Sequence, residues 1–237
     1  SIMDKKTILA WYKEIGVDEV ISENPVDKIE NSVQTAKSLE KNSASSLNQS
    51  LRPTLDFSDI KTLDQLKVKL QSFEGCHLKK TALHTVFSDG QPDAKIVVIG
   101  EAPGADEDRL GKPFVGVSGQ LLDRMFATIG LSREKNLYII NTIPWRPPGN
   151  RNPTMQELQA CLPFLYHHIK LVNPEVLLLV GGISTKTILQ TQESLSKLRS
   201  HFYDVNLPGI EKTLKAYPLY HPAYLLRSPG QKRQAWR

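Results

Sequence analysis

Cysteine is scarce in this sequence, where Cys76 and Cys161 are the only two among 237 residues. Two thiols are too few for a disulfide framework or for a four-thiolate metal site. The chain also lacks any run approaching the roughly 20 apolar residues of a membrane helix, and no segment of signal-peptide type opens it. These absences lead us to expect a cytoplasmic protein without membrane spans.

The charge balance is mildly basic and selects no function by itself. Lys and Arg number 30 against 25 Asp and Glu, which gives a formal net charge of +5 and a pI of about 9.1. Such a balance suits nucleic-acid binding, but many soluble enzymes share it. The length and the 40% hydrophobic content allow one α/β core with additional segments.

The first quarter of the chain differs in composition from the rest. Residues 1–22 suit an amphipathic helical extension, which we expect either to dock on a protein partner or to pack back on the core. Residues 23–60 are largely polar, rich in Ser, Asn, Gln and Lys, and predict a flexible linker. The remaining segment, 61–237, is expected to form the folded domain.

Strand and helix patterns alternate through that segment. Four consecutive β-branched residues at 96–99 predict a buried parallel strand, and a capping box at Thr154 marks a helix start. The alternation predicts a three-layer α/β/α sandwich around a mostly parallel four-stranded sheet. The strands are expected at 96–99, 137–140, 175–180 and 213–219, and the helices at 62–73, 118–129, 154–171 and 184–189.

Four polar loops follow the predicted strands. They begin at Glu101, at Asn141, at the glycine pair 181–182 and at His221. The carboxyl ends of parallel strands lie at one edge of a sheet, where ligands bind in open α/β folds. We therefore expect Glu101, Asn141 and His221 to converge there.

Each of these side chains has an ordinary interpretation and a functional one. Glu101 either caps a helix or pairs with a cation, or it is a site carboxylate. Asn141 forms an Asx turn, or its amide matches the edge of a uracil-like imide. His221 belongs to a turn, or it donates to a carbonyl that gains negative charge. Phe114 belongs to the core, or it stacks on a base.

Other loop residues point toward nucleic acid, although solvated and core interpretations stay open. Arg146, Arg151 and Arg227 fit phosphate contacts, and Leu226 fits an apolar wedge that enters a base stack. The sequence has no zinc-ligand spacing, no Walker lysine, no dinucleotide fingerprint and no nucleophile elbow. These absences argue against several common α/β enzymes.

Three ordered motifs together resemble the uracil-DNA glycosylase superfamily, and family 4 most of all. The first spans Gly100 to Asp123 and contains Gly-Glu-Ala-Pro-Gly, Glu-Asp and Gly-x-Pro-Phe-Val-Gly. The second is Asn141 with Arg-Pro-Pro-Gly-Asn-Arg at 146–151, and the third is His-Pro-Ala-Tyr-Leu-Leu-Arg at 221–227. The similarity covers roughly residues 76–237.

The resemblance implies a monofunctional hydrolase of base excision repair, which flips deoxyuridine out of DNA, releases uracil and leaves an abasic site. It makes Glu101, Asn141 and His221 the expected catalytic residues. Glu101 would order water or stabilise positive charge on the sugar. Family 1 has an aspartate at the position of Ala102, so a strong general base is not implied here and much of the rate is expected from electrostatic stabilisation. The expected substrate-binding residues are Gly100, Ala102, Pro103, Gly104, Phe114, Ser118 and Asn141, and the expected DNA-binding residues are Arg146, Arg151, Arg199, Leu226 and Arg227.

The sequence departs from family 4 at the iron–sulfur ligands. Most members hold a [4Fe–4S] cluster with four cysteines, and the resemblance places these at Phe73, Cys76, Trp145 and Cys161. We therefore expect no cofactor and no metal, with Phe73 and Trp145 packed as apolar residues. The expected protein is a monomer.

Two alternatives stay open. A related branch of the superfamily binds abasic DNA covalently without turnover, through a histidine in an inserted basic loop after the second motif. Arg151 here leads directly to Asn152-Pro153-Thr154, which leaves no room for such a loop. The second alternative is a nucleotide-binding α/β enzyme that acts on a small phosphorylated substrate.

Overall fold

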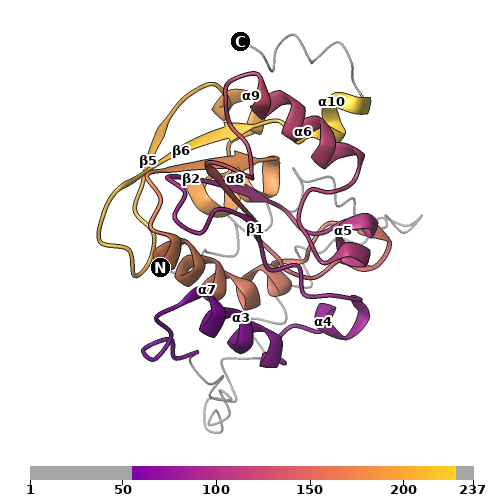
Figure 1. Cartoon of the computed structure of the whole chain (residues 1–237), viewed down its shortest axis with the longest axis vertical. Helices are drawn as coiled ribbons and strands as arrows, with labels where there is room; N and C mark the ends of the chain where they lie inside the picture. Colours follow the sequence, from indigo (N-terminus) through magenta and orange to yellow (C-terminus); the bar gives the residue numbers. More distant parts are fainter. Residues whose placement is uncertain (1–54, 228–237) are drawn as a thin grey trace, which may run out of the picture.

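The computed structural model describes residues 55–227, whose centre is a six-stranded sheet in the order β1-β3-β2-β4-β6-β5 (Figure 1). The predicted extension and most of the predicted linker lie outside these residues. The four central strands run parallel and begin and end within one residue of the predicted bounds. They are β2 (Ile96–Gly100), β3 (Leu137–Asn141), β4 (Val176–Val180) and β6 (Leu214–Leu219).

The predicted strand number was wrong, because a short antiparallel strand flanks the parallel centre at each edge. β1 (Asp89–Gly90) pairs with β3, and β5 (Tyr203–Val205) pairs with β6. Strands of two and three residues are too short to show an alternating pattern. Asp-Gly is moreover a common turn sequence, so β1 carried no strand signal.

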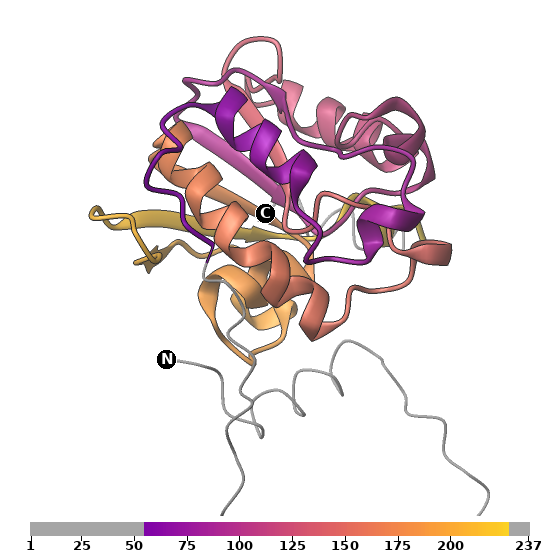
Figure 2. The same cartoon turned by 90° about the horizontal axis from the view of Figure 1, so that it is seen from below.

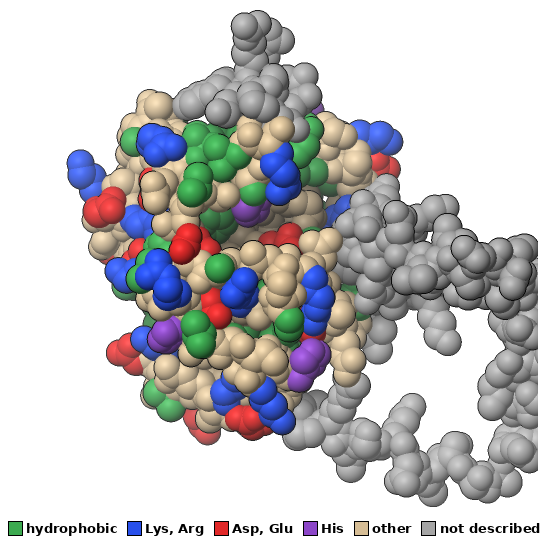
Figure 3. Space-filling model, turned by 90° about the vertical axis from the view of Figure 1, so that its right-hand side faces the viewer, with side chains coloured by type: hydrophobic (Ala, Val, Ile, Leu, Met, Phe, Trp, Pro, Cys, Tyr) green, Lys and Arg blue, Asp and Glu red, His purple; other side chains and the backbone are tan. Residues whose placement is uncertain are grey.

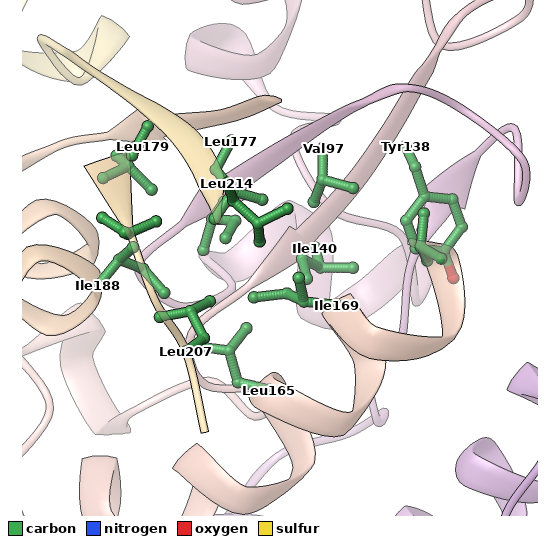
Figure 4. Packing of buried hydrophobic residues seen from close by; sticks show 14 of the residues in the cluster. Val97, Tyr138, Ile140, Leu165, Ile169, Leu177, Leu179, Ile188, Leu207 and Leu214 are labelled. Atoms are coloured by element: carbon green, nitrogen blue, oxygen red, sulfur yellow. The ribbon is translucent and has the colours of Figure 1, made fainter. Parts of the chain in front are cut away.

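One face of the sheet carries the largest apolar cluster. Val97 of β2 lies there with Leu165 of α7 (Met155–Val172) and Ile188 of α8 (Gly182–Leu189) (Figure 4). Burying each such side chain contributes about 1.5–3 kcal/mol. This face therefore anchors α7 and α8 on the sheet.

The opposite face is covered by a different helix. Val98, the neighbour of Val97 in β2, points to this side and clusters with Leu122 and Phe126 of α6 (Val117–Ala127). Successive strand residues point to opposite faces, so the β-branched run supplies both clusters at once. Helices thus cover both faces of the sheet, as Figure 2 shows from a second direction.

The helix starts follow their capping residues. Thr62 and Thr154 form capping boxes at the starts of α3 and α7, so both predicted starts are confirmed. Among the described helices, none combines the length and apolar character needed to cross a bilayer. The predicted helices at 62–73 and 184–189 correspond to α3 (Leu63–Ser72) and α8. The helices of six residues or fewer were not predicted; they are α4 (Leu78–Thr81), α5 (Ala105–Leu110), η1 (Pro148–Asn150), α9 (Leu195–Leu198) and α10 (Pro222–Arg227).

Residues 55–60 belong to the packed part of the chain. The Phe57 ring lies 5.1 Å from the Phe164 ring, and the backbone carbonyl of Ile60 lies 2.8 Å from Nε2 of His167. Leu55, Phe57 and Ile60 all pack on the cluster between α3 and α7. The segment grouped with the linker by composition therefore includes apolar residues that contact the domain.

Candidate active site

A pocket of about 570 Å³ lies at the carboxyl edge of the central strands. Glu101 follows β2, Asn141 ends β3 and His221 comes shortly after β6, and all three line this pocket. Figure 3 shows a hollow on the face that carries α5 and α10, with a histidine and acidic side chains inside it. Parallel strands bring these three loops together at one edge.

Backbone hydrogen bonds join the first two loops. The amide and the hydroxyl of Thr142 each donate to the carbonyl of Gly100 over 2.9 Å. The next amide, that of Ile143, donates to the carbonyl of Glu101 over 3.0 Å. These bonds extend the β2–β3 pairing past the end of the sheet and hold Asn141 beside the Glu101 loop.

Glu101 is a largely buried carboxyl group at the pocket wall. Burial raises its pKa from the ordinary 4.5 to about 7, because the charged form loses hydration. Within residues 55–227 its carboxylate has no hydrogen-bond or ion-pair partner. Neither ordinary interpretation, a helix cap or an ion pair, therefore describes Glu101.

His221 is held as a neutral imidazole. Burial, together with the nearby Arg227, lowers its pKa to about 4. The backbone amide of Ala223 donates to Nδ1 over 3.1 Å, so Nδ1 is an acceptor and the proton resides on Nε2. A neutral Nε2–H donor therefore belongs to the pocket wall.

Phe114 is both a core residue and a pocket residue. Its side chain is 6% exposed, and it packs on the α6 face of the sheet while it also lines the pocket. The ring lies 5.9 Å from the His221 ring at an angle of 31°. Its backbone has φ of +52°, an unusual value for a residue other than glycine.

Gly100 provides the close approach on which this arrangement depends. A Cβ atom at this position would collide with Oδ1 of Asn141 and would lie 2.6 Å from the Phe114 ring. Asn141 itself is 9% exposed at the pocket wall. The Asn141 amide and the Phe114 ring can therefore both lie close to the backbone of Gly100, because glycine has no side chain.

Glu107 is a pocket residue to which the sequence assigned no role. One carboxylate oxygen accepts the amides of Val115 and Gly116, each over 2.9 Å, and the other accepts the amide of Gly104 over 3.2 Å. Glu107 therefore joins the Glu101 loop to the Phe114 loop, residues 113–116. The Glu-Asp pair of the first motif was its signal in the sequence.

The predicted substrate-binding residues divide into lining and supporting positions. Gly100 lies beneath Asn141 and Phe114 rather than in the lining itself. The pocket also includes Asp106, Glu107 and Asn150, to which no site role was assigned, and the glycine pair after β4, whose loop was expected at this edge. The predicted residues that line it are Glu101, Ala102, Pro103, Gly104, Phe114, Ser118, Asn141, Arg151, His221 and Arg227.

The predicted DNA-binding residues have different surroundings. Arg151 reaches the pocket, but its guanidinium makes two bonds, of 2.6 and 2.9 Å, to the buried carboxylate of Glu157. Arg146, Arg199 and Leu226 lie outside the described lining. Arg146 donates to Asn150 over 2.6 Å, Arg199 lies over the Tyr220 ring at 4.9 Å, and Leu226 is 38% exposed.

The four positions at which the resemblance leads us to expect the family 4 cysteines lie together in one apolar cluster. The rings of Phe73 and Trp145 stack at 6.5 Å, and Trp145 donates from Nε1 to Thr85 over 2.9 Å. Cys76 and Cys161 are buried free thiols in the same cluster. Two thiols beside two aromatic rings do not fit a cluster that needs four thiolates.

Metal-binding arrangements of side chains are also absent from the rest of the described residues. Between residues 55 and 227, no group of three or more His, Cys, Asp and Glu side chains has an arrangement that could hold a metal ion. The described lining of the pocket presents carboxyl, amide, imidazole and aromatic groups.

Comparisons with known proteins match most of this chain to one family. The model of the uracil DNA glycosylase superfamily matches residues 87–237. A type-4 uracil-DNA glycosylase of Archaeoglobus fulgidus is 37% identical over 179 residues, which cover 74% of this chain and 88% of the relative. The corresponding protein of Saccharolobus solfataricus is 40% identical over 70% of this chain and 78% of its own. That of Thermotoga maritima is 35% identical over 68% and 81%.

Proposed function

This chain belongs to the uracil DNA glycosylase superfamily, and on that premise we propose how its pocket removes uracil from DNA. The chain is a uracil-DNA repair glycosylase, a hydrolase that acts in base excision repair. One observation carries the assignment of residues. A carboxyl, an amide, an aromatic ring and a neutral imidazole line one pocket of about 570 Å³, within the range of about 300–1,000 Å³ that is usual for ligand pockets.

Substrate binding begins with extrusion of deoxyuridine from the duplex, because a pocket at a sheet edge cannot reach a stacked base. The uracil ring stacks on Phe114. The Asn141 amide pairs with the imide edge of the base through one donor and one acceptor. Gly100 permits the approach of both side chains, since a larger residue there would occupy their space.

Hydrolysis breaks the bond between C1′ of the sugar and N1 of uracil, and the bonding electron pair leaves with the base. Nε2–H of His221 donates to the uracil oxygen on which this negative charge develops. Glu101, when ionised, stabilises the positive charge on the sugar or orders the attacking water. Water adds at C1′ and loses a proton to solvent, the uracil anion takes up one proton, and the products are uracil and an abasic site.

DNA is held by loops around the pocket. Arg227, which lines the pocket, and Arg146 and Arg199, which lie outside it, contact phosphates. Leu226, partly exposed at the end of α10, enters the space that the flipped base vacates. Arg151 also lines the pocket, and its bonds to Glu157 fix the start of α7 beside it.

No iron–sulfur cluster takes part. The apolar cluster of Phe73 and Trp145 with two thiols replaces it as the element that joins α4, α7 and the loop after β3. Covalent capture of abasic DNA without turnover is not favoured, because the relatives with the highest identity reported above are type-4 uracil-DNA glycosylases and the inserted basic loop is missing.

A gel assay tests the function. The protein is incubated with a labelled oligonucleotide that contains one uracil, and half of each sample is heated in alkali. We expect alkali-dependent cleavage at the uracil, none in the matched thymine oligonucleotide, and strong loss of cleavage in folded His221→Ala and Asn141→Ala variants. An alkali-stable shifted band would indicate covalent capture instead, and no product from uracil DNA would refute the assignment.

A further inference from the structure

We propose that Arg133 is a positioning residue for the aromatic wall of the pocket. It lies outside the described lining of the pocket. It acts through Phe114, whose backbone carbonyl accepts a hydrogen bond from its guanidinium. This inference rests on the function proposed above, since it gives Phe114 the role of stacking on uracil. It adds a residue that no motif contains.

The guanidinium of Arg133 has five N–H groups, and each has an acceptor. Two donate to the backbone carbonyls of Pro113 and Phe114, over 2.9 and 2.7 Å. The other three donate to carboxylates, one to Asp89 over 3.0 Å and two to Asp123 over 3.1 and 2.9 Å. The side chain is only 10% exposed, so these bonds form largely out of water.

The carboxylates orient the arginine for this task. Asp89 lies in the edge strand β1 and Asp123 lies in α6, so Arg133 is held by the sheet on one side and by a helix on the other. A planar fork with both ends anchored can present two N–H groups to two successive carbonyls. Lysine has three donors on one atom and cannot reproduce this pattern.

Glu107 binds the same loop at the residues that follow Phe114. Its carboxylate accepts the amides of Val115 and Gly116, the two residues that follow Phe114. The Phe114 carbonyl is thus bound from one side and the following amides from the other. Glu107 and Arg133 together fix the orientation of the peptide groups around Phe114.

This fixation matters because Phe114 has a conformation that it would not adopt freely. A φ of +52° places Cβ too close to the neighbouring carbonyl for most residues. Gly119 adds a steric restriction, since a Cβ there would collide with the Phe114 carbonyl. When the Arg133 bonds are lost, we expect the loop to relax and the ring to leave the plane that uracil requires.

A double-mutant cycle tests the coupling, with Arg133→Lys, Phe114→Ala and the double variant assayed on uracil DNA. Arg133→Lys should lower kcat/KM about 10-fold, chiefly through KM, because stacking on an aromatic ring contributes to binding of the base. With Phe114→Ala already present, it should change kcat/KM less than about 2-fold. Lys135→Gln, which removes a positive charge from the same turn, is the matched control and should leave activity unchanged.

Hydrogen exchange gives a second measurement that needs no activity. In folded Arg133→Lys, the amides of residues 111–118 should exchange faster, while those of β3 and α7 keep their rates. If Arg133→Lys fails to fold, Asp123→Asn serves instead. It keeps the arginine but weakens the acceptor of two of its five bonds, and it should change both measurements in the same direction.

The outcomes separate the possibilities. Unchanged exchange at 111–118 would overturn the proposal, and so would equal effects of Arg133→Lys with and without Phe114, which would indicate a merely structural role. If the wild-type protein failed to excise uracil while Arg133→Lys still loosened 111–118, the proposed function would fail and the fixation of Phe114 would stand.

Discussion

The backbone amide of Ala223 donates a hydrogen bond of 3.1 Å to Nδ1 of His221. Because one imidazole nitrogen is thereby an acceptor, the other must carry the proton in the neutral ring. The first turn of α10 supplies this amide, so the turn that follows His221 selects its tautomer. A neutral donor gains its strength from burial and orientation rather than from charge.

The first prediction concerns the pH dependence of His221. Since burial and Arg227 lower its pKa to about 4, the ring stays neutral from pH 5 upward. We expect no decrease in the excision rate as the pH rises through 6.5, where an imidazolium of ordinary pKa would lose its proton, and we expect His221→Ala to lower kcat by about 10²–10³-fold, as loss of an oxyanion donor does. Single-turnover excision across pH 5–9 measures both. A rate that falls with deprotonation near pH 6.5 would contradict the neutral assignment.

The second prediction concerns Glu101, whose pKa is raised to about 7 by burial. If the ionised carboxylate acts on the sugar, the wild-type excision rate should rise through about pH 7 and then level off. Glu101→Gln should excise more slowly and lose this step. A wild-type profile without the step, or Glu101→Gln with wild-type activity, would remove Glu101 from the chemistry.

The same raised pKa has a consequence for stability. Between pH 4.5 and about 7 the folded state binds the Glu101 proton more tightly than the unfolded state, so this contribution to stability is lost as pH rises. Glu101→Gln should therefore be more stable than wild type at pH 8, by up to roughly 3 kcal/mol, and nearly equal to it at pH 4. Urea unfolding at the two pH values measures the difference.

The parallel centre of the fold and the convergence of the site loops were predictable because both follow from local patterns. A β-branched run such as 96–99 has few alternatives to a buried strand, and parallel strands must present their carboxyl ends at one edge. The topology alone therefore predicts that Glu101, Asn141 and His221 lie at one edge of the sheet. In the structure all three line one pocket there.

The contacts that orient these side chains were not predictable. Arg133 is one of several charged residues in its turn, and its four acceptor residues come from three separate places in the chain. Arg151 was predicted as a phosphate ligand from its loop position, yet its bond to Glu157 depends on the capping geometry of α7. Hydrogen bonds between distant segments leave no periodicity in the sequence.

The third prediction concerns Trp145. Its side chain is 1% exposed, and its Nε1–H has a partner in Thr85. Truncation leaves a large cavity beside Phe73, so Trp145→Ala should cost about 3–5 kcal/mol of unfolding free energy. Urea unfolding measures this loss, and Trp145→Phe, which keeps most of the apolar volume, should lose much less.

Iron content distinguishes this packing role from a vestigial metal site. Protein purified without oxygen should show no visible absorbance band and no stoichiometric iron, and Cys76→Ser with Cys161→Ser should retain excision activity when folded. A brown protein that bleaches when the two cysteines are replaced would mean that other ligands complete a cluster.

The fourth prediction concerns Gly100. Its φ is not positive, so alanine could adopt the same backbone conformation without strain. The added Cβ would nevertheless collide with Asn141 and with the Phe114 ring. Gly100→Ala should therefore raise KM for uracil DNA by about 10-fold or more, because both base-contacting side chains are displaced. Circular dichroism should show that the sheet remains intact.

Replacing Asn141 by Ala in the same chain relieves one collision, so the double variant should lose less activity than the product of the two single losses. Full multiplicativity would show that Gly100 and Asn141 act independently.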